Sequence, residues 1–226
     1  MIDGVKLRER FLALELSGAN VTVPHKEDAF MACDEVRGFA KEIKVVNTIV
    51  NENGKLIGYN TDADGFVYAI KEFENIKSIL IIGAGGTAKA LSLRLVQDGF
   101  CVDVLNRSSL RFDDFKNSSV ACFTWSDFKP KRYDLVVNTT SAGLSDDEYP
   151  APKIVLEEIL NNCSFVFDVI YGKVTPFLRL AKEKGIVSKD GSDMLLAQGV
   201  IANHLLMHKK IEMENIKPHM QRSFSF

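Results

Sequence analysis

The most constraining feature of this sequence is a regular alternation of two kinds of segment between Ser78 and Gly185. Short apolar runs of strand length, the first being SILII at residues 78–82, alternate with longer stretches whose apolar residues recur at helical spacing. Such alternation is typical of a parallel sheet whose strands are connected by helices on both faces. The sequence therefore predicts an α/β fold with a Rossmann-like, doubly wound parallel sheet in this region.

Turn residues delimit the elements expected here. Gly99 and Gly185 are expected to end two helices, and Pro176 stands at an early helical position, where its missing N–H is tolerated. Strands are expected within residues 78–85, 101–108, 120–125, 133–140 and 165–172, and helices within 86–99, 151–163 and 175–185.

The two ends of the chain have a different character. Val21 and Val23 predict a short strand ended by Pro24, and Asn53-Gly54 predicts a hairpin turn. Helices are expected at 7–16, after Lys26 and at 193–210, and the last residues, 219–226, are expected to be a loose tail. We expect both ends (1–62 and 192–226) to form a smaller α/β substrate domain and 63–191 to form a nucleotide-binding domain, with the functional cleft between them.

Composition excludes several classes of protein. The 226 residues are 46% hydrophobic, enough for a sizeable core, and the net charge of −2 gives no basic surface for nucleic acid. No apolar run is long enough to span a bilayer. The four cysteines are scattered without a Cys-x-x-Cys pair, which favours free thiols in a reducing compartment. We therefore expect a cytoplasmic protein with no nucleic-acid or membrane partner.

A glycine-rich stretch, GAGGTA at 83–88, follows the first strand and opens a helix. Gly83 permits a tight turn, Gly85 allows close approach of a pyrophosphate, and Ala88 takes the position where the helix packs closely on the strand. The helix N-terminus offers N–H groups and a positive dipole end to phosphates. The stretch predicts dinucleotide binding, the alternative being an ordinary glycine-rich turn.

The end of the next strand favours NADP over NAD. An NAD site places an acid there to bind the ribose hydroxyls, but Asp103 lies inside the apolar run, before the strand ends. The end itself carries guanidinium, hydroxyl and amide groups that suit a 2′-phosphate, in Asn106, Arg107, Ser108 and Arg111. The alternative is a solvated turn.

A second polar set precedes the nucleotide-binding region. Lys26 follows Pro24, Asn47 follows an apolar pair, and Asn60, Thr61 and Asp62 stand in a turn before a helix. A lysine beside a carboxylate can hold a substrate hydroxyl and relay its proton. Taken alone, Lys26 also fits a solvated charge, and Asp62 fits a helix N-cap.

Taken together, the motifs NVTVPHK, VNT, GYNTDADG, GAGGTAKA, NRS, VVNTTSAGL, DVIYGKVTPFL and DGSDMLLAQG resemble those of shikimate dehydrogenases, from Val21 to about Gly199. The resemblance implies reversible NADP-dependent oxidation of shikimate to 3-dehydroshikimate, a step of chorismate and aromatic amino-acid biosynthesis, with no metal. It also allows a homodimer.

The resemblance implies these roles. Lys26 matches the catalytic lysine and Asp62 its partner, while Thr22, Asn47, Gln198 and Tyr171 match substrate contacts. Gly83, Ala84, Gly85, Gly86 and Thr87 match the phosphate loop, and Asn106, Arg107, Ser108 and Arg111 match the 2′-phosphate motif. Ile170 and Gly191 match positions beside the nicotinamide. Which of Lys26 and Asp62 accepts the proton is left open.

Two departures from the family pattern stand out. Nothing before Val21 resembles the family's first strand and Ser-x-Ser turn, so the sequence is expected to be shortened at its N-terminus, and Asp193 stands where the family often has glycine. Two alternatives therefore remain open: a quinate/shikimate dehydrogenase that uses NAD, and a truncated NADP-binding protein with little catalytic activity.

Overall fold

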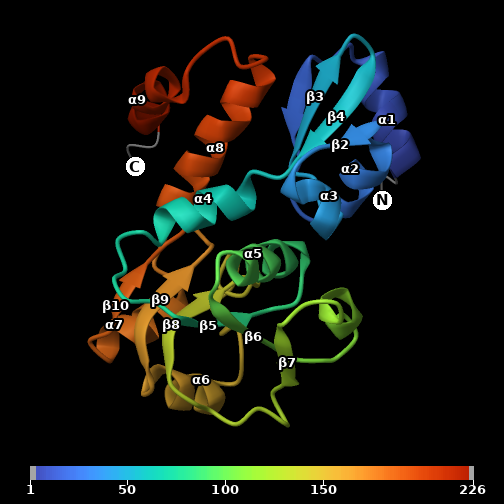
Figure 1. Ribbon diagram of the computed structural model, residues 1–226. Helices are drawn as coiled ribbons and strands as arrows, with labels where there is room; N and C mark the ends of the chain where they lie inside the picture. The colour runs from blue at the N-terminus through green and yellow to red at the C-terminus, as the bar shows by residue number, and fades with distance from the viewer. Residues whose placement is uncertain (1–3, 224–226) are drawn as a thin grey trace. The chain divides into compact units, whose positions relative to one another are not determined.

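The computed structural model describes residues 4–223, with side chains from Lys6 onward. The chain divides into two compact units (Figure 1). One unit contains the described residues up to Phe66 and those from Leu196 onward, and the other runs from Val67 to Leu195. Among the described residues, no helix combines the length and apolar character needed to cross a membrane.

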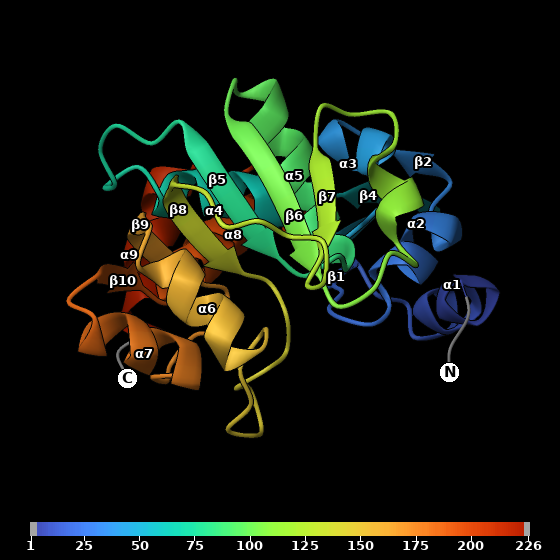
Figure 2. The ribbon, with the colours of Figure 1, turned by 90° about the horizontal axis from the view of Figure 1, so that it is seen from below.

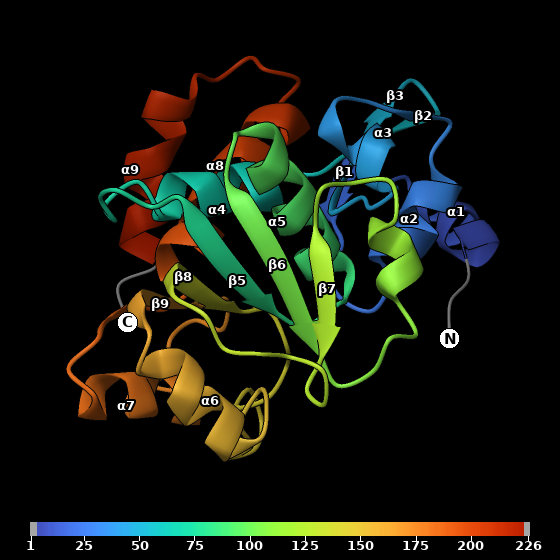
Figure 3. The same cartoon turned by 60° about the horizontal axis from the view of Figure 1, so that its bottom comes forward.

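The Val67–Leu195 unit contains a six-stranded sheet, and Figure 3 shows its strands β5, β6 and β7 at full length. The strand order β10-β9-β8-β5-β6-β7, with every neighbouring pair parallel, confirms the predicted doubly wound sheet. The strands are β5 (Ser78–Ile82), β6 (Cys101–Asn106), β7 (Ala121–Thr124), β8 (Tyr133–Asn138), β9 (Cys163–Asp168) and β10 (Val187–Lys189).

Helices cover both faces of this sheet, as predicted. Helix α5 (Gly86–Gln97) lies on one side and α6 (Lys153–Leu160) on the other, with α7 (Pro176–Glu183) beside α6 and the 3₁₀ helix η1 (Phe112–Phe115) after β6 (Figures 1 and 2). On the α6 side of the sheet, side chains of α6 and α7 pack with those of the strands in one hydrophobic core. This core includes Leu80, Val136, Leu156, Val166 and Phe177. Burial of these apolar side chains holds the strands in fixed register, including the end of β5 that the glycine-rich stretch follows.

The other unit has a four-stranded sheet of order β1-β3-β4-β2. Its elements are α1 (Gly4–Ala13), β1 (Gly18–Asn20), α2 (Lys26–Ala32), β2 (Glu35–Val36), α3 (Phe39–Ile43), β3 (Thr48–Glu52) and β4 (Lys55–Tyr59). Asn53 and Gly54 both have positive φ, at 57° and 87°, which confirms the predicted hairpin turn between β3 and β4. Further along are α4 (Asp62–Ala69), α8 (Ser192–Leu206) and α9 (Met213–Ser223); both α4 and α8 cross the boundary between the units.

Three local predictions are wrong. The first strand is β1, which ends at Asn20 instead of including Val21 and Val23: the Val21 N–H still bonds to the Asn47 carbonyl (2.7 Å), after which the chain turns at Thr22.

The last long helix, α8, ends at Leu206, short of the expected residue 210, because His208 and Lys209 have left-handed φ angles of 50° and 59°. Most of the expected loose tail is helical. Residues 219–223 belong to α9, which packs Ile216 and Met220 on Leu196 and Val200 of α8. The remaining residues of that predicted tail, 224–226, lie outside the described part of the chain.

Candidate functional site

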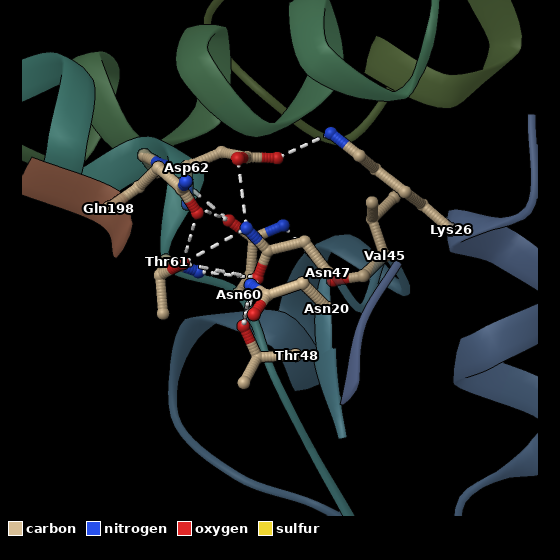
Figure 4. A network of polar contacts seen from close by, with 10 residues as sticks. Asn20, Lys26, Val45, Asn47, Thr48, Asn60, Thr61, Asp62 and Gln198 are labelled. Carbon is tan, nitrogen blue, oxygen red and sulfur yellow. Dashed lines mark hydrogen bonds and ion pairs between the residues drawn. The ribbon is translucent and has the colours of Figure 1, made fainter. Parts of the chain in front are cut away.

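The centre of the candidate site is an ion pair between two helix starts. Lys26 is the first residue of α2 and Asp62 the first of α4, and Lys26 Nζ lies 2.6 Å from Asp62 Oδ2 (Figure 4). The two side chains are only 12% and 11% exposed. The Lys26 carbonyl accepts the Val46 N–H at 3.0 Å, which ties the start of α2 to the segment before β3. This pairing therefore joins residues far apart in the sequence in a partly desolvated position.

Asn47 is the hub of the surrounding hydrogen-bond network. Its Nδ2 donates to Asp62 Oδ1 at 2.8 Å and to Thr61 Oγ1 at 3.0 Å, and its Oδ1 accepts from the Thr61 N–H at 2.9 Å and from Thr48 Oγ1 at 3.0 Å. Asn47 is 2% exposed, so each of these bonds satisfies a polar group removed from water. Asn47 therefore holds the carboxylate oxygen of Asp62 that Lys26 does not contact (Figure 4).

Asn60 performs the capping role that Asp62 could have taken. Its Oδ1 accepts the N–H groups of Asp62 (3.1 Å) and Ala63 (3.4 Å) at the start of α4, and its Nδ2 donates to the Val45 carbonyl at 3.2 Å. The alternative interpretation of Asp62 as the N-cap is therefore wrong. Both oxygens of that carboxylate are directed to Lys26 and Asn47 instead.

The predicted substrate contacts are only partly brought together. Gln198 joins the network, since its Oε1 lies 3.2 Å from Thr61 Oγ1. Thr22 is exposed in the turn before α2, and no hydrogen bond within the described residues links its hydroxyl to the network. Tyr171 belongs to the Val67–Leu195 unit, where its side chain is 48% exposed.

The glycine-rich loop after β5 has the geometry that a pyrophosphate requires. Gly83 has φ +112°, and a Cβ there would lie 2.6 Å from Thr139 Oγ1, so the tight turn expected at Gly83 is confirmed. At Gly85 a Cβ would meet nothing within 4 Å, which leaves open space beside the backbone. The first intrahelical bond of α5 runs from the Lys89 N–H to the Gly85 carbonyl, so the three preceding helical N–H groups are available to an anion. These residues fit a dinucleotide.

The end of β6 fits a 2′-phosphate better than ribose hydroxyls. Asn106 Nδ2 donates to the Ser108 carbonyl at 2.9 Å and shapes the turn on which Arg107 and Arg111 are exposed. Asp103 is engaged inside the sheet: its Oδ2 accepts from the Tyr133 hydroxyl at 2.6 Å and pairs with Lys131 Nζ at 2.7 Å. Burial, together with that bond to Asp103, raises the pKa of Tyr133. Asp103 thus has a structural role within the sheet.

Ile170 and Gly191 are in direct backbone contact. The Gly191 N–H donates to the Ile170 carbonyl at 3.0 Å, and a Cβ on Gly191 would lie 2.2 Å from the Val169 carbonyl oxygen. Only glycine permits this approach.

Sequence reasoning missed a buried polar cluster at the ends of β8 and β9. Asp168 Oδ1 accepts from Asn138 Nδ2 at 3.0 Å and from the Ile170 N–H at 3.1 Å, and its Oδ2 accepts from the Thr175 hydroxyl at 2.7 Å. Burial raises the pKa of Asp168, while the three bonds oppose that rise. The available signal was a polar residue ending each of two adjacent apolar strands, since Asn138 and Asp168 are paired in register.

Comparisons with known proteins point to one family. The family model described as shikimate dehydrogenase substrate binding domain matches residues 5–49. Shikimate dehydrogenase (NADP(+)) of Helicobacter hepaticus is 43% identical over 225 residues, covering 99% of this chain and 83% of that protein. The protein of the same name from Helicobacter acinonychis is 47% identical over 197 residues, covering 87% of this chain and 73% of its own length.

Solved structures agree with these relatives. Shikimate 5-dehydrogenase from Thermus thermophilus, in complex with NADP(H) and shikimate, is similar with a TM-score of 0.81 and 32% identity, over 96% of this chain and 84% of that one. Shikimate dehydrogenase from Aquifex aeolicus gives a TM-score of 0.81 and 37% identity, over 92% and 78% of the two chains.

Proposed function

The chain belongs to the shikimate dehydrogenase family, and from that premise we propose that it catalyses the reversible NADP-dependent oxidation of shikimate to 3-dehydroshikimate. The observation that carries the proposal is the 2.6 Å ion pair between Lys26 and Asp62, held by the Asn47 network. Oxidation of an alcohol requires that its hydroxyl lose a proton while its carbon loses a hydride, and this pair supplies the proton handling.

The roles of the two residues follow from their contacts. The Lys26 ammonium donates to a hydroxyl oxygen and stabilises the negative charge that develops there as the O–H bond weakens. Asp62 keeps the ammonium in place and takes part in accepting the proton, so that the two act as one coupled acid–base unit. Asn47 holds the carboxylate in a fixed plane and prevents it from turning away. Thr22, Asn47, Gln198 and Tyr171 are proposed to bind the remaining polar groups of shikimate.

The cofactor is proposed to bind along the carboxyl ends of β5 and β6. The phosphate loop is Gly83, Ala84, Gly85, Gly86 and Thr87, and the 2′-phosphate is held by Asn106, Arg107, Ser108 and Arg111. The nicotinamide, when bound, accepts the hydride. Ile170 and Gly191 are proposed to border it, with Gly191 leaving room that a larger side chain would fill.

The cellular setting is also a proposal. All four cysteines are free, and burial raises the pKa of Cys33 and of Cys163 to about 12, so both thiols stay protonated at neutral pH. Such thiols suit a reducing compartment, and we place the enzyme in the cytoplasm. A homodimer is proposed as its assembly, to be tested by light scattering coupled to size-exclusion chromatography.

Initial rates of NADPH formation test the proposed function. We expect saturable turnover with shikimate and NADP⁺, and much slower reactions when NAD⁺ replaces NADP⁺ or quinate replaces shikimate. A preference for NAD⁺ with quinate would favour the quinate/shikimate dehydrogenase alternative. NADP⁺ binding in a calorimetric titration without any turnover would identify a cofactor-binding protein of low activity and overturn the proposal.

A further inference from the structure

The segment 169–172, between β9 and α7, has no regular secondary structure, yet its backbone is held at several points. The Val169 N–H donates to the Asn138 carbonyl at 3.0 Å, and the Ile170 carbonyl accepts from the Gly191 N–H at 3.0 Å. The Gly172 N–H donates to Asp190 Oδ2 at 3.0 Å. Tyr171 therefore stands between two anchored residues, while its own side chain remains half exposed.

Two carboxylates also accept N–H groups of this segment. Asp168 accepts the Ile170 N–H at 3.1 Å, and Asp190 accepts the Gly172 N–H. Asp168 is fully buried and also holds Asn138 and Thr175, so its removal would leave several polar groups without partners in the core. Asp190 is partly exposed and its contacts are local, which makes it the residue whose removal the fold tolerates.

The Asp190 carboxylate bridges the segment to the start of α8. Its Oδ1 accepts the Ser192 N–H at 3.1 Å, and its Oδ2 accepts the Ser192 hydroxyl at 3.0 Å as well as the Gly172 N–H. Between Asp190 and Ser192 lies Gly191, whose α-carbon approaches the Val169 carbonyl so closely that a Cβ would lie 2.2 Å from the oxygen. Besides the direct bond from the Gly191 N–H to the Ile170 carbonyl, the Asp190 side chain thus provides a second link between the segment and the turn at Gly191.

We propose that Asp190 is a positioning residue that sets the placement of Ile170 and Tyr171 relative to Gly191 through its bond to the Gly172 N–H. The catalytic consequence rests on the proposed function, in which Tyr171 borders the substrate and Ile170 and Gly191 border the nicotinamide. Loss of the bond releases one end of the segment, and small displacements of groups that orient a reacting pair are costly for the chemical step.

Amide hydrogen exchange tests the structural part of this proposal without any ligand. In D190A we expect exchange at Gly172 to accelerate at least about tenfold, because the Gly172 N–H loses its acceptor. D190N retains one carbonyl oxygen and should show a smaller acceleration. The matched control is D134A, which removes a carboxylate that likewise accepts two N–H groups, those of Lys77 and Ser78 (both 2.9 Å), at the opposite end of β8. Unchanged protection at Gly172 in D190A would overturn the proposal.

Kinetics and a double-mutant cycle test the catalytic part. We expect D190A to lower kcat about tenfold and to raise KM for shikimate, while the NADP⁺ dissociation constant measured by calorimetry stays within about twofold of wild type. If Asp190 acts through Tyr171, D190A should have little additional effect in a Y171A background, whereas independent roles would give additive losses. Additive losses, or a parallel weakening of NADP⁺ binding and of thermal stability, would show a merely structural role. If the wild-type chain lacks turnover, the proposed function fails, and the exchange experiment decides the positioning role alone.

Discussion

Lys26 Nζ lies 2.6 Å from Asp62 Oδ2, although the two residues are 36 positions apart in the sequence. The pair is about nine-tenths buried and the second carboxylate oxygen is occupied by Asn47 at 2.8 Å. An ammonium held in this way is a fixed donor, because neither partner can reorient without breaking a hydrogen bond to a group removed from water. The proposed chemistry depends on that fixed donor.

Replacing Lys26 by methionine keeps the length of the side chain and removes its charge and hydrogen bonds. We expect kcat/KM for shikimate to fall by about 10²- to 10⁴-fold, the usual contribution of a positioned acid–base group, while the NADP⁺ dissociation constant is unchanged. K55M is the matched control, since Lys55 is an exposed lysine paired with Glu35 at 2.7 Å. Initial rates and calorimetry measure both quantities. A K26M enzyme with near wild-type kcat/KM would remove Lys26 from the mechanism.

Asn47 is expected to contribute to stability as well as to activity. N47A leaves the Asp62 Oδ1 and the Thr61 N–H without their partners in a buried position, which should lower the free energy of unfolding by about 1–3 kcal/mol. N47D also places a second carboxylate beside Asp62 and should lose more activity than N47A. Urea denaturation gives the first quantity and initial rates give the second. N51A provides a comparison for activity, because Asn51 also makes two hydrogen bonds, from its Nδ2 to the Leu16 carbonyl at 3.0 Å and from the Gly54 N–H to its Oδ1 at 2.7 Å, and neither involves Asp62.

The parts of the fold that could be predicted from the sequence are those specified by local signals. The apolar run before Gly83, the helical spacing after Gly86 and the Asn53-Gly54 turn each determine structure within a few residues. The three-residue strand β10 carries no such signal, because strands this short are formed by pairing, here between Val187 and Phe165. Helix α9 was missed for a related reason: Pro218 argues locally against a helix, and the packing of Ile216 on α8 outweighs it.

The candidate site, too, could be predicted from the sequence only in part. The residue types at Lys26, Asn47 and Asp62 indicated a polar constellation, but Asn60 and Asp62 are equally good capping residues by sequence. Only long-range contacts determine which of the two caps α4. The Asp62 carboxylate bonds to Lys26 and Asn47, and Asn60 caps the helix. Asp168 was missed because its role depends on Asn138, which lies beside it only once β8 and β9 pair.

Cofactor selectivity is expected to depend on the turn after β6. Substituting Arg107 by alanine removes an exposed guanidinium that suits a 2′-phosphate dianion, and we expect the NADP⁺ dissociation constant to rise about tenfold or more. NAD⁺ lacks the phosphate, so its affinity should change little. R179A, which removes an exposed arginine on α7, is the control. Equal weakening of NADP⁺ and NAD⁺ binding would show that Arg107 does not read the 2′-phosphate.

Stability in acid is expected to depend on Glu35. Hydrogen bonds from Arg37 (2.6 Å) and Lys55 (2.7 Å) lower the pKa of its carboxyl from 4.5 to about 2. A carboxyl whose pKa is lower in the folded state stabilises the fold above its unfolded pKa, and that contribution is lost as the pH falls from about 4.5 towards 2.

The variant E35Q keeps the size of the side chain and cannot ionise. We expect its melting temperature to lie below that of wild type at pH 6 and to converge with it by about pH 2, with a smaller difference in high salt because the site is exposed. Melting curves between pH 2 and 7 measure this convergence. E74Q is the comparison, since Glu74 is an exposed glutamate that lies outside this group of paired charges. A difference between wild type and E35Q that stays constant across the whole range would show that the ionised carboxyl of Glu35 does not stabilise the fold.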